Sequence, residues 1–246
     1  MRDPAIHTGE TVERLPGTTL SVLQKQKGYR FSIDAVLLAG CIRLRPGSRA
    51  MELGSGSGVI SLILAARQAE VLISGIDIQE EMVDMSNRSA LLNGFKERVS
   101  FACRDVREIR RHYEPGSYDV VFFNPPYRKV GSGRINPLRE KAAARHEVYG
   151  TIDDFVGGAA FLLKEKGRVY VIYPASRSVG LIASLRQNGL EPKVLRFVHS
   201  EASSPAVFVL AEGIRGGGEE VTVMSPLVLF DAPGLYSAEV REMTGE

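Results

Sequence analysis

The chain has 246 residues, 44% of them hydrophobic, which fits one large domain, or a domain with a small appendage, around a substantial core. Its formal net charge of +2 excludes a strongly basic protein, so any affinity for nucleic acid must come from local clusters of basic residues. Two cysteines, Cys41 and Cys103, are too few for a zinc site, and the lack of a signal peptide or a long apolar run predicts a cytoplasmic protein.

Residues 1–45 precede the first predicted core strand and are expected to form an N-terminal extension packed on a domain that spans residues 46–246. Within this extension, Gln26-Lys27-Gly28 predicts the turn of a β-hairpin. The apolar run that follows predicts a helix from about Ile33 to Ile42. Ser32 and Asp34 can cap this helix or contact a bound ligand, and both interpretations can hold.

Strand-like apolar runs alternate with helical patterns through the rest of the chain. This order predicts a Rossmann-like α/β fold, with a mostly parallel sheet of seven strands and helices on both faces. The predicted strands lie near Arg49–Leu53, Val71–Asp77, Val99–Cys103, Asp119–Phe123, Arg168–Tyr173, Pro192–Val198 and Ala206–Ala211. The predicted helices are Gly58–Arg67, Glu80–Asn93, Ile152–Lys164 and Ser176–Asn188. Gly94 and Gly189 follow two of these helices as expected C-caps.

A glycine-rich segment, Glu52-Leu53-Gly54-Ser55-Gly56-Ser57-Gly58, lies between the first core strand and the helix that follows. Glycine allows the backbone to turn tightly and to approach a ligand closely. A dinucleotide fingerprint would need a glycine where Val59 stands, which disfavours NAD. An acidic residue, Glu52, followed by this spacing instead favours S-adenosylmethionine, whose amino-acid end would lie along Gly54, Gly56 and Gly58.

Two aspartates follow the next two predicted strands. Asp77, 23 residues after Gly54, stands where a carboxylate can accept hydrogen bonds from both ribose hydroxyls. Asp105 is expected to accept a hydrogen bond from the cofactor's adenine amino group. Either aspartate can instead cap the helix that follows it. Their neighbours Ile78 and Val106 are expected to contact the cofactor, and the predicted cofactor site also includes Ser32, Asp34 and Asn124.

The tetrapeptide Asn124-Pro125-Pro126-Tyr127 directly follows the apolar run Tyr118–Phe123, which is typical of a buried strand. A proline pair cannot continue a central strand, so the chain must leave the sheet at Asn124. Open α/β sheets bind ligands at the carboxyl ends of their strands, which places these four residues at a binding crevice. The alternative is a rigid loop exit without a catalytic role.

The tetrapeptide suits the methylation of a nucleobase amine. Such an amine is a poor nucleophile, because its lone pair is delocalised into the ring. The side-chain oxygen of Asn124 and the carbonyl of Pro125 can each accept one N–H bond and stabilise the charge that develops on nitrogen. Tyr127 can stack on the base. The reaction needs neither a metal nor a strong base, because the nitrogen becomes acidic once it is methylated.

The segment Arg128–His146 contains glycine and is predicted to be a mobile loop. Its six basic residues against one acidic residue give a net charge of +5, which predicts contact with RNA phosphates. A solvated loop is the alternative. An unpaired base, as in an anticodon loop, reaches such a pocket most easily. The six basic residues are Arg128, Lys129, Arg134, Arg139, Lys141 and Arg145. His146 is expected to orient the loop or cap the next helix.

In this order, the glycine turn, the acidic residue after the second strand and Asn-Pro-Pro-Tyr resemble class I S-adenosylmethionine-dependent amino-methyltransferases. Two further segments, residues 29–39 (YRFSIDAVLLA) and residues 144–147 (ARHE), resemble the bacterial tRNA1(Val) adenine-37 N6-methyltransferase family. The resemblance covers roughly Leu20 to Tyr236. It implies that Gly54, Gly56 and Asp77 hold the cofactor and that the Asn-Pro-Pro-Tyr segment holds the target adenine. Asp77 stands where a glutamate is common in the family.

Three other functions remain open. Glutamine methyltransferases of peptide release factors use the same tetrapeptide, but they carry a separate N-terminal helical domain, whereas only about 45 residues precede the first core strand here. Guanine N2-methyltransferases of ribosomal RNA often have a duplicated domain and a phenylalanine where Tyr127 stands. A noncatalytic RNA-binding module is a further alternative. The sequence does not indicate an oligomeric state.

Overall fold

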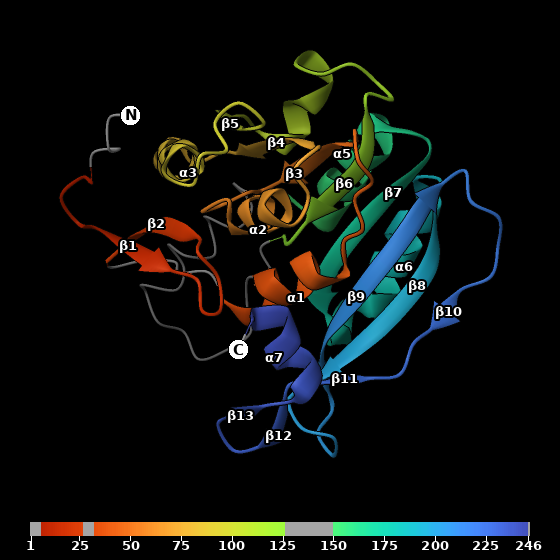
Figure 1. Cartoon of the computed structure of the whole chain (residues 1–246). Helices are drawn as coiled ribbons and strands as arrows, with labels where there is room; N and C mark the ends of the chain where they lie inside the picture. The colour runs from red at the N-terminus through yellow and green to blue at the C-terminus, as the bar shows by residue number, and fades with distance from the viewer. Residues whose placement is uncertain (1–5, 27–31, 126–149, 246) are drawn as a thin grey trace, which may run out of the picture.

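The computed structural model describes residues 6–26, 32–125 and 150–245, and its centre is a nine-stranded sheet (Figure 1). The strand order is β10-β8-β9-β7-β6-β3-β4-β5, and β11 also pairs with β8. The strands of this sheet are β3 (Arg49–Leu53), β4 (Leu72–Asp77), β5 (Val99–Cys103), β6 (Tyr118–Phe123), β7 (Leu163–Pro174), β8 (Leu190–His199), β9 (Ala206–Arg215), β10 (Thr222–Val223) and β11 (Leu227–Val228).

The seven predicted strands are confirmed, and most of them are parallel. In the sheet as described, β9 runs antiparallel to its neighbours β7 and β8. The structure adds the two-residue strands β10 and β11, which are too short to produce an alternating pattern in the sequence. The α/β fold class is therefore confirmed, with an edge extended beyond the expected seven strands.

Helices cover both faces of the sheet (Figure 1). The side chains of β6 alternate, as in any strand, so Val120 and Phe122 face one hydrophobic cluster, while Val121 and Phe123 face the other. The first cluster includes residues of α1 (Ile33–Cys41), α2 (Val59–Arg67) and α3 (Glu80–Leu92). The second includes residues of η1 (Val106–Arg111), α5 (Ile152–Leu162) and α6 (Ser178–Gln187). The α-helices among them match the predicted ones to within a few residues, whereas η1 has no counterpart among the predicted helix ranges.

The N-terminal hairpin consists of β1 (Glu10–Arg14) and β2 (Ser21–Lys25), so its turn lies between Arg14 and Ser21. The predicted hairpin around Gln26-Lys27-Gly28 falls largely outside the described residues, and the turn between Arg14 and Ser21 was not predicted. Thr18 stabilises the actual turn, because its hydroxyl donates to the Leu15 carbonyl and accepts from the Leu20 N–H. The sequence segment 15–20 lacks the Asn-Gly or Asp-Gly pair that marks a tight hairpin, which is why the pattern did not reveal it.

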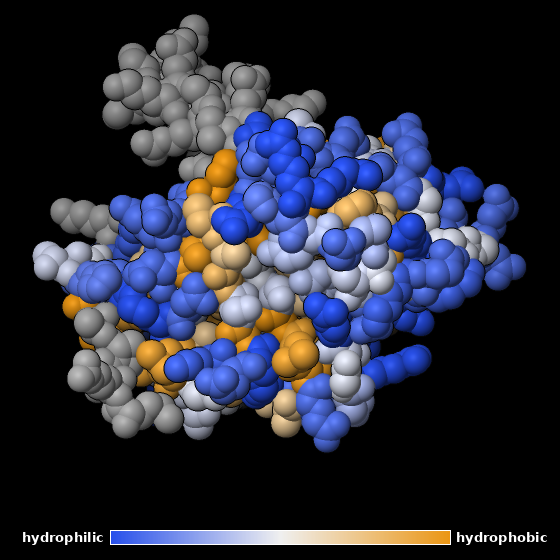
Figure 2. All heavy atoms as spheres, turned by 90° about the horizontal axis from the view of Figure 1, so that it is seen from above, coloured by the Kyte–Doolittle hydropathy of each residue, from blue (hydrophilic) through white to orange (hydrophobic). Residues whose placement is uncertain are grey.

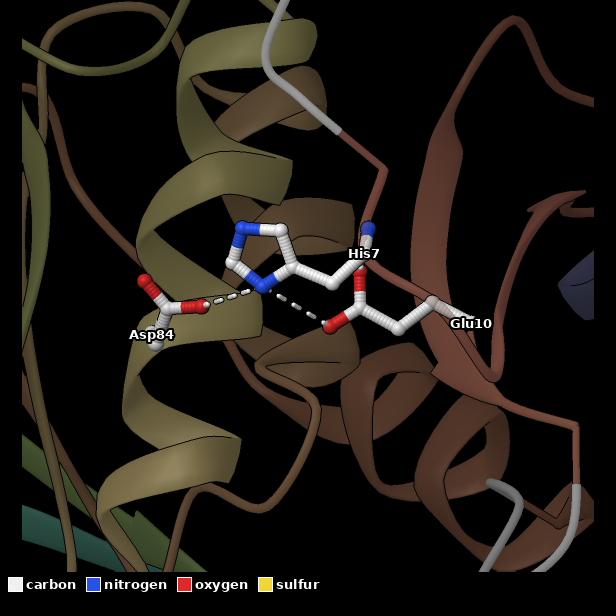
Figure 3. A group of neighbouring side chains, drawn as sticks. All are labelled: His7, Glu10 and Asp84. Atoms are coloured by element: carbon white, nitrogen blue, oxygen red, sulfur yellow. Dashed lines mark hydrogen bonds and ion pairs between the residues drawn. The ribbon is translucent and has the colours of Figure 1, made fainter.

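A cluster of charged side chains fastens this hairpin to α3 (Figure 3). The Arg88 guanidinium binds both carboxylate oxygens of Glu10, at 2.6 and 2.8 Å, and also contacts Asp84. This pairing lowers the pKa of Glu10 to about 2. His7 lies 3.7 Å from Glu10 and 3.9 Å from Asp84, a grouping that resembles a metal site. Because Arg88 pairs with both carboxylates, the contacts within this cluster are those of a structural ion-pair network.

The C-terminal segment contains β12 (Phe230–Ala232), β13 (Leu235–Tyr236) and α7 (Ala238–Thr244), none of which the sequence pattern predicted. Helix α7 packs against α1, where a Cβ atom at Gly40 would lie 3.1 Å from the sulfur of Met243. Arg67 joins the two helices, because its guanidinium donates to the carbonyls of Ala39 and Met243. Because Arg67 belongs to α2, helix α1 contacts α2 as well as α7. Among the described residues, every helix is too short or too polar to cross a membrane.

Candidate active site

The carboxyl ends of three neighbouring parallel strands bring the predicted site residues together. Leu53 at the end of β3 is in register with Ile76 of β4 on one side and Phe123 of β6 on the other. The residues that come directly after these three partners are therefore adjacent in space. They are Gly54, which begins the glycine turn, Asp77, which is the last residue of β4, and Asn124. This edge of the sheet is where open α/β folds bind ligands.

The glycine turn requires glycine for both conformational and steric reasons. Gly54, Gly56 and Gly58 have φ angles of 69°, 52° and 72°, in the left-handed region that other residues rarely adopt. At Gly58, a Cβ atom would also lie 2.7 Å from the ring of Phe101. The turn ends at Gly58, which is the N-cap of α2. Three backbone amides of the turn already donate to protein acceptors, which fixes the shape of the turn.

Asp77 ties the glycine turn to the end of β4. Its Oδ2 accepts a hydrogen bond from the Gly56 N–H at 2.8 Å, and its Oδ1 accepts one from the Gln79 N–H at 2.9 Å. Burial raises the pKa of Asp77, while these hydrogen bonds lower it. The N-cap of α3 is Gln79, so Asp77 is not the capping residue of that helix. Ile78 beside it is half-buried. The Gln79 side-chain amide also donates to Oδ1, at 3.5 Å, so at least one of the about four acceptor positions of a carboxylate is left for a ligand.

Glu52 lies one residue before the end of β3 and is only 2% exposed. Burial raises the pKa of Glu52 to about 8, against the opposing effect of a hydrogen bond donated by the Ser61 hydroxyl of α2. Ser55 in the glycine turn is also buried, and its hydroxyl oxygen has no hydrogen-bond partner among the described residues. Sequence reasoning missed Ser55 as a site residue, because a serine between glycines gives no signal beyond turn chemistry.

Asp105 caps η1 in this structure. Its Oδ1 accepts a hydrogen bond from the Arg107 N–H at 2.9 Å, and its carboxylate pairs with the Arg107 guanidinium. This partner lowers the pKa of Asp105. The capping role is therefore confirmed, and the predicted contact of Asp105 with the cofactor's adenine stays a prediction. Val106 is buried in the hydrophobic cluster of α5. An open cavity of about 510 Å³ is lined by Asp105, Arg107, Glu108, Arg110 and Arg111. Figure 2 shows hydrophilic side chains around strips of hydrophobic ones on the face seen from above.

Asn124 is linked to the start of α1. Its Nδ2 donates to Asp34 Oδ2 at 3.0 Å, while its Oδ1 is buried and has no hydrogen-bond partner among the described residues. Asp34 is 4% exposed and also accepts hydrogen bonds from the Ser32 hydroxyl and from the Ala35 N–H. Ser32 is the N-cap of α1, but its side chain makes no capping hydrogen bond. The prediction that the Ser32 side chain caps this helix is therefore wrong.

Two residues of the tetrapeptide, Asn124 and the buried Pro125, are among the described residues. Its remaining residues, Pro126 and Tyr127, lie outside the described part of the chain. The same holds for His146 and for the predicted RNA-contacting residues Arg128, Lys129, Arg134, Arg139, Lys141 and Arg145. Their predicted roles stay predictions.

Comparisons with known proteins agree with this geometry. A family model described as a methyltransferase domain matches residues 44–203. The chain is 31% identical over 178 residues, which are 72% of this chain and 71% of the relative, to a tRNA1(Val) (adenine(37)-N6)-methyltransferase of Erwinia tasmaniensis. A protein of the same name from Serratia proteamaculans is 27% identical over 211 residues, which are 85% of this chain and 80% of that protein.

Among solved structures, a predicted O-methyltransferase from Agrobacterium tumefaciens has the same fold. The two chains superpose with a TM-score of 0.71 at 20% sequence identity, over 86% of this chain and 95% of the other. At this level of identity the similarity concerns the fold alone. The fold is thus that of Rossmann-like class I methyltransferases, as predicted.

Proposed function

This chain belongs to the tRNA1(Val) (adenine(37)-N6)-methyltransferase family, and we propose that it methylates N6 of an unpaired adenine in tRNA, adenosine 37 of tRNA1(Val) in particular. The observation that carries the catalytic part of this proposal is the buried Oδ1 of Asn124, which has no hydrogen-bond partner in the described part of the chain. A buried acceptor without a donor costs free energy, of the order of 1–3 kcal/mol, which an incoming N–H group would recover. The exocyclic amine of adenine has two such N–H groups.

We propose that the methyl donor is S-adenosylmethionine and that the glycine turn holds it. Gly54 and Gly56 would approach its amino-acid end, and the remaining acceptor positions of Asp77 would bind its ribose hydroxyls. The buried hydroxyl of Ser55 supports this placement, because it lies in the same turn and finds no hydrogen-bond partner within residues 6–26, 32–125 and 150–245. The chemistry that the cofactor supplies is a methyl group on a positively charged sulfur, and S-adenosylhomocysteine is the product.

In this proposal the protein positions and polarises the amine. Asn124 Oδ1 accepts one N–H bond of the target amine, and the Pro125 carbonyl accepts the other. Both contacts pull electron density toward nitrogen and strengthen as positive charge develops there. Tyr127 stacks on the base. The lone pair of N6 forms the new N–C bond while the S–C bond breaks, and the proton then leaves to solvent, so no metal is invoked.

The basic residues between Arg128 and Arg145 are proposed to contact the tRNA backbone, because six cations that follow the Asn-Pro-Pro-Tyr segment in the sequence suit phosphate binding. Residues 1–45 are proposed to act as an extension of the methyltransferase domain, docked through the N-terminal hairpin and α1. A tRNA substrate would place the enzyme in the cytoplasm.

The proposal is tested by incubating the protein with labelled S-adenosylmethionine and, in parallel, unmodified total tRNA and peptide release factors. Mass spectrometry of the digested products then identifies the methylated group. We expect N6-methyladenosine in tRNA1(Val) and no label on protein. Label on a release-factor glutamine alone would assign the chain to the rival function, and label in neither substrate would leave no support for methylation of either.

A further inference from the structure

We infer that Asp34 is a positioning residue, which orients the Asn124 side-chain amide so that its oxygen, and not its nitrogen, meets the target amine. This inference rests on the proposed role of Asn124. An asparagine amide has a donor end and an acceptor end that can exchange by rotation about the side chain. Only the acceptor end can bind the N–H groups of an amine. Something must therefore select the productive orientation.

The contacts of Asp34 provide that selection. Its Oδ2 accepts from Asn124 Nδ2 at 3.0 Å, which directs Asn124 Oδ1 away from the carboxyl group. Rotation of the amide would bring an oxygen against an oxygen, and it would present Nδ2 to an amine that also donates. Both contacts of the rotated state are unfavourable. The observed orientation is the one in which Oδ1 lacks a partner among the described residues.

The position of Asp34 is itself well determined. Its Oδ1 accepts from the Ser32 hydroxyl and from the Ala35 N–H at 3.0 Å, and the residue is only 4% exposed. Helix α1, which carries Asp34, packs between α2 and α7, and Arg67 bonds to the carbonyls of Ala39 and Met243. A fixed acceptor is thus brought to the end of β6 from an element 90 residues away in the sequence.

The experiment compares Asp34→Asn with the exchanged double variant, which combines Asp34→Asn and Asn124→Asp. In the single variant, the amide introduced at position 34 can donate or accept, so the Asn124 amide loses its preferred orientation. We expect kcat for tRNA methylation to fall about 10- to 100-fold, as for the loss of one hydrogen bond to a charged group. In the double variant, the amide at position 34 donates to the carboxylate at position 124, which presents an acceptor in either orientation. We expect at least part of kcat to return.

Calorimetric titration with S-adenosylmethionine separates this role from a role in cofactor binding and also checks that the variants fold. Because Asp34 is also a predicted cofactor contact, kcat is measured at saturating S-adenosylmethionine, where a change in Kd does not affect it. Ser32→Ala should also lower kcat, but by a smaller factor than Asp34→Asn, because Asp34 keeps its other contacts.

Three results would overturn the inference. They are an unchanged kcat in Asp34→Asn, a double variant no more active than the single one, and a fall in activity that saturating cofactor removes. Failure of the proposed function is distinguishable, because then the unaltered protein itself would not form N6-methyladenosine in tRNA.

Discussion

The backbone N–H of Gly56 donates to Asp77 Oδ2 at 2.8 Å and thereby joins the glycine turn after β3 to the end of β4. One carboxylate thus shapes the turn and, in the proposed function, holds the ribose of the cofactor. The two roles are compatible because Asp77 is held by hydrogen bonds from Gly56 and Gln79 while acceptor positions remain.

Replacing Asp77 with alanine should weaken cofactor binding by about 10- to 100-fold, because hydrogen bonds to a charged group are lost and the glycine turn loses its anchor. Asp105→Ala is the matched control, because it removes a carboxylate at the end of the next strand that already pairs with Arg107. We expect Asp105→Ala to weaken binding less than tenfold. Calorimetric titration with S-adenosylmethionine measures both, and equal losses would contradict the distinction between the two aspartates.

Alanine at Gly58 should destabilise the fold more than alanine at Gly94. Both glycines have φ angles above 70°, so each substitution strains the backbone by about 1–2 kcal/mol. A Cβ atom at Gly94 meets nothing within 4 Å, whereas one at Gly58 lies 2.7 Å from Phe101. We expect Gly58→Ala to lower the free energy of unfolding by about 1–3 kcal/mol more than Gly94→Ala. Urea denaturation of both variants tests this, and equal free energies of unfolding would contradict it.

Glu52 should make the protein less stable as pH rises. Burial raises the pKa of Glu52 from 4.5 to about 8, so folding favours the protonated form. The contribution of protonated Glu52 to the free energy of unfolding is fully present below about pH 4.5 and is lost as pH rises through about 8. Glu52→Gln should flatten the fall in unfolding free energy between these pH values. Part of the fall should remain in this variant, because burial also raises the pKa of Asp77. If the free energy of unfolding falls equally with pH in the variant and in the unaltered protein, Glu52 is not the cause of the fall.

The sequence predicted the sheet well because each core strand is long enough to show a buried run, as Tyr118–Phe123 does. It also predicted where Asn124 stands, since a proline pair ends a strand. It could not predict the Asp34–Asn124 contact, because local patterns around residue 34 indicate only a helix start. It likewise missed α7 and the two-residue strands, whose stability comes from packing on α1 and β8 and not from a periodic pattern of their own.

The measurement that tests the central claim most directly is the rate of N6-methyladenosine formation in tRNA by Asn124→Ala, with the product identified by mass spectrometry. Loss of the acceptor for the target amine should lower kcat about 100- to 1000-fold, as for removal of one group that stabilises transition-state charge. The rate is measured at saturating S-adenosylmethionine, because Asn124 is also a predicted cofactor contact. Formation of the same nucleoside at the unaltered rate would contradict the proposed mechanism.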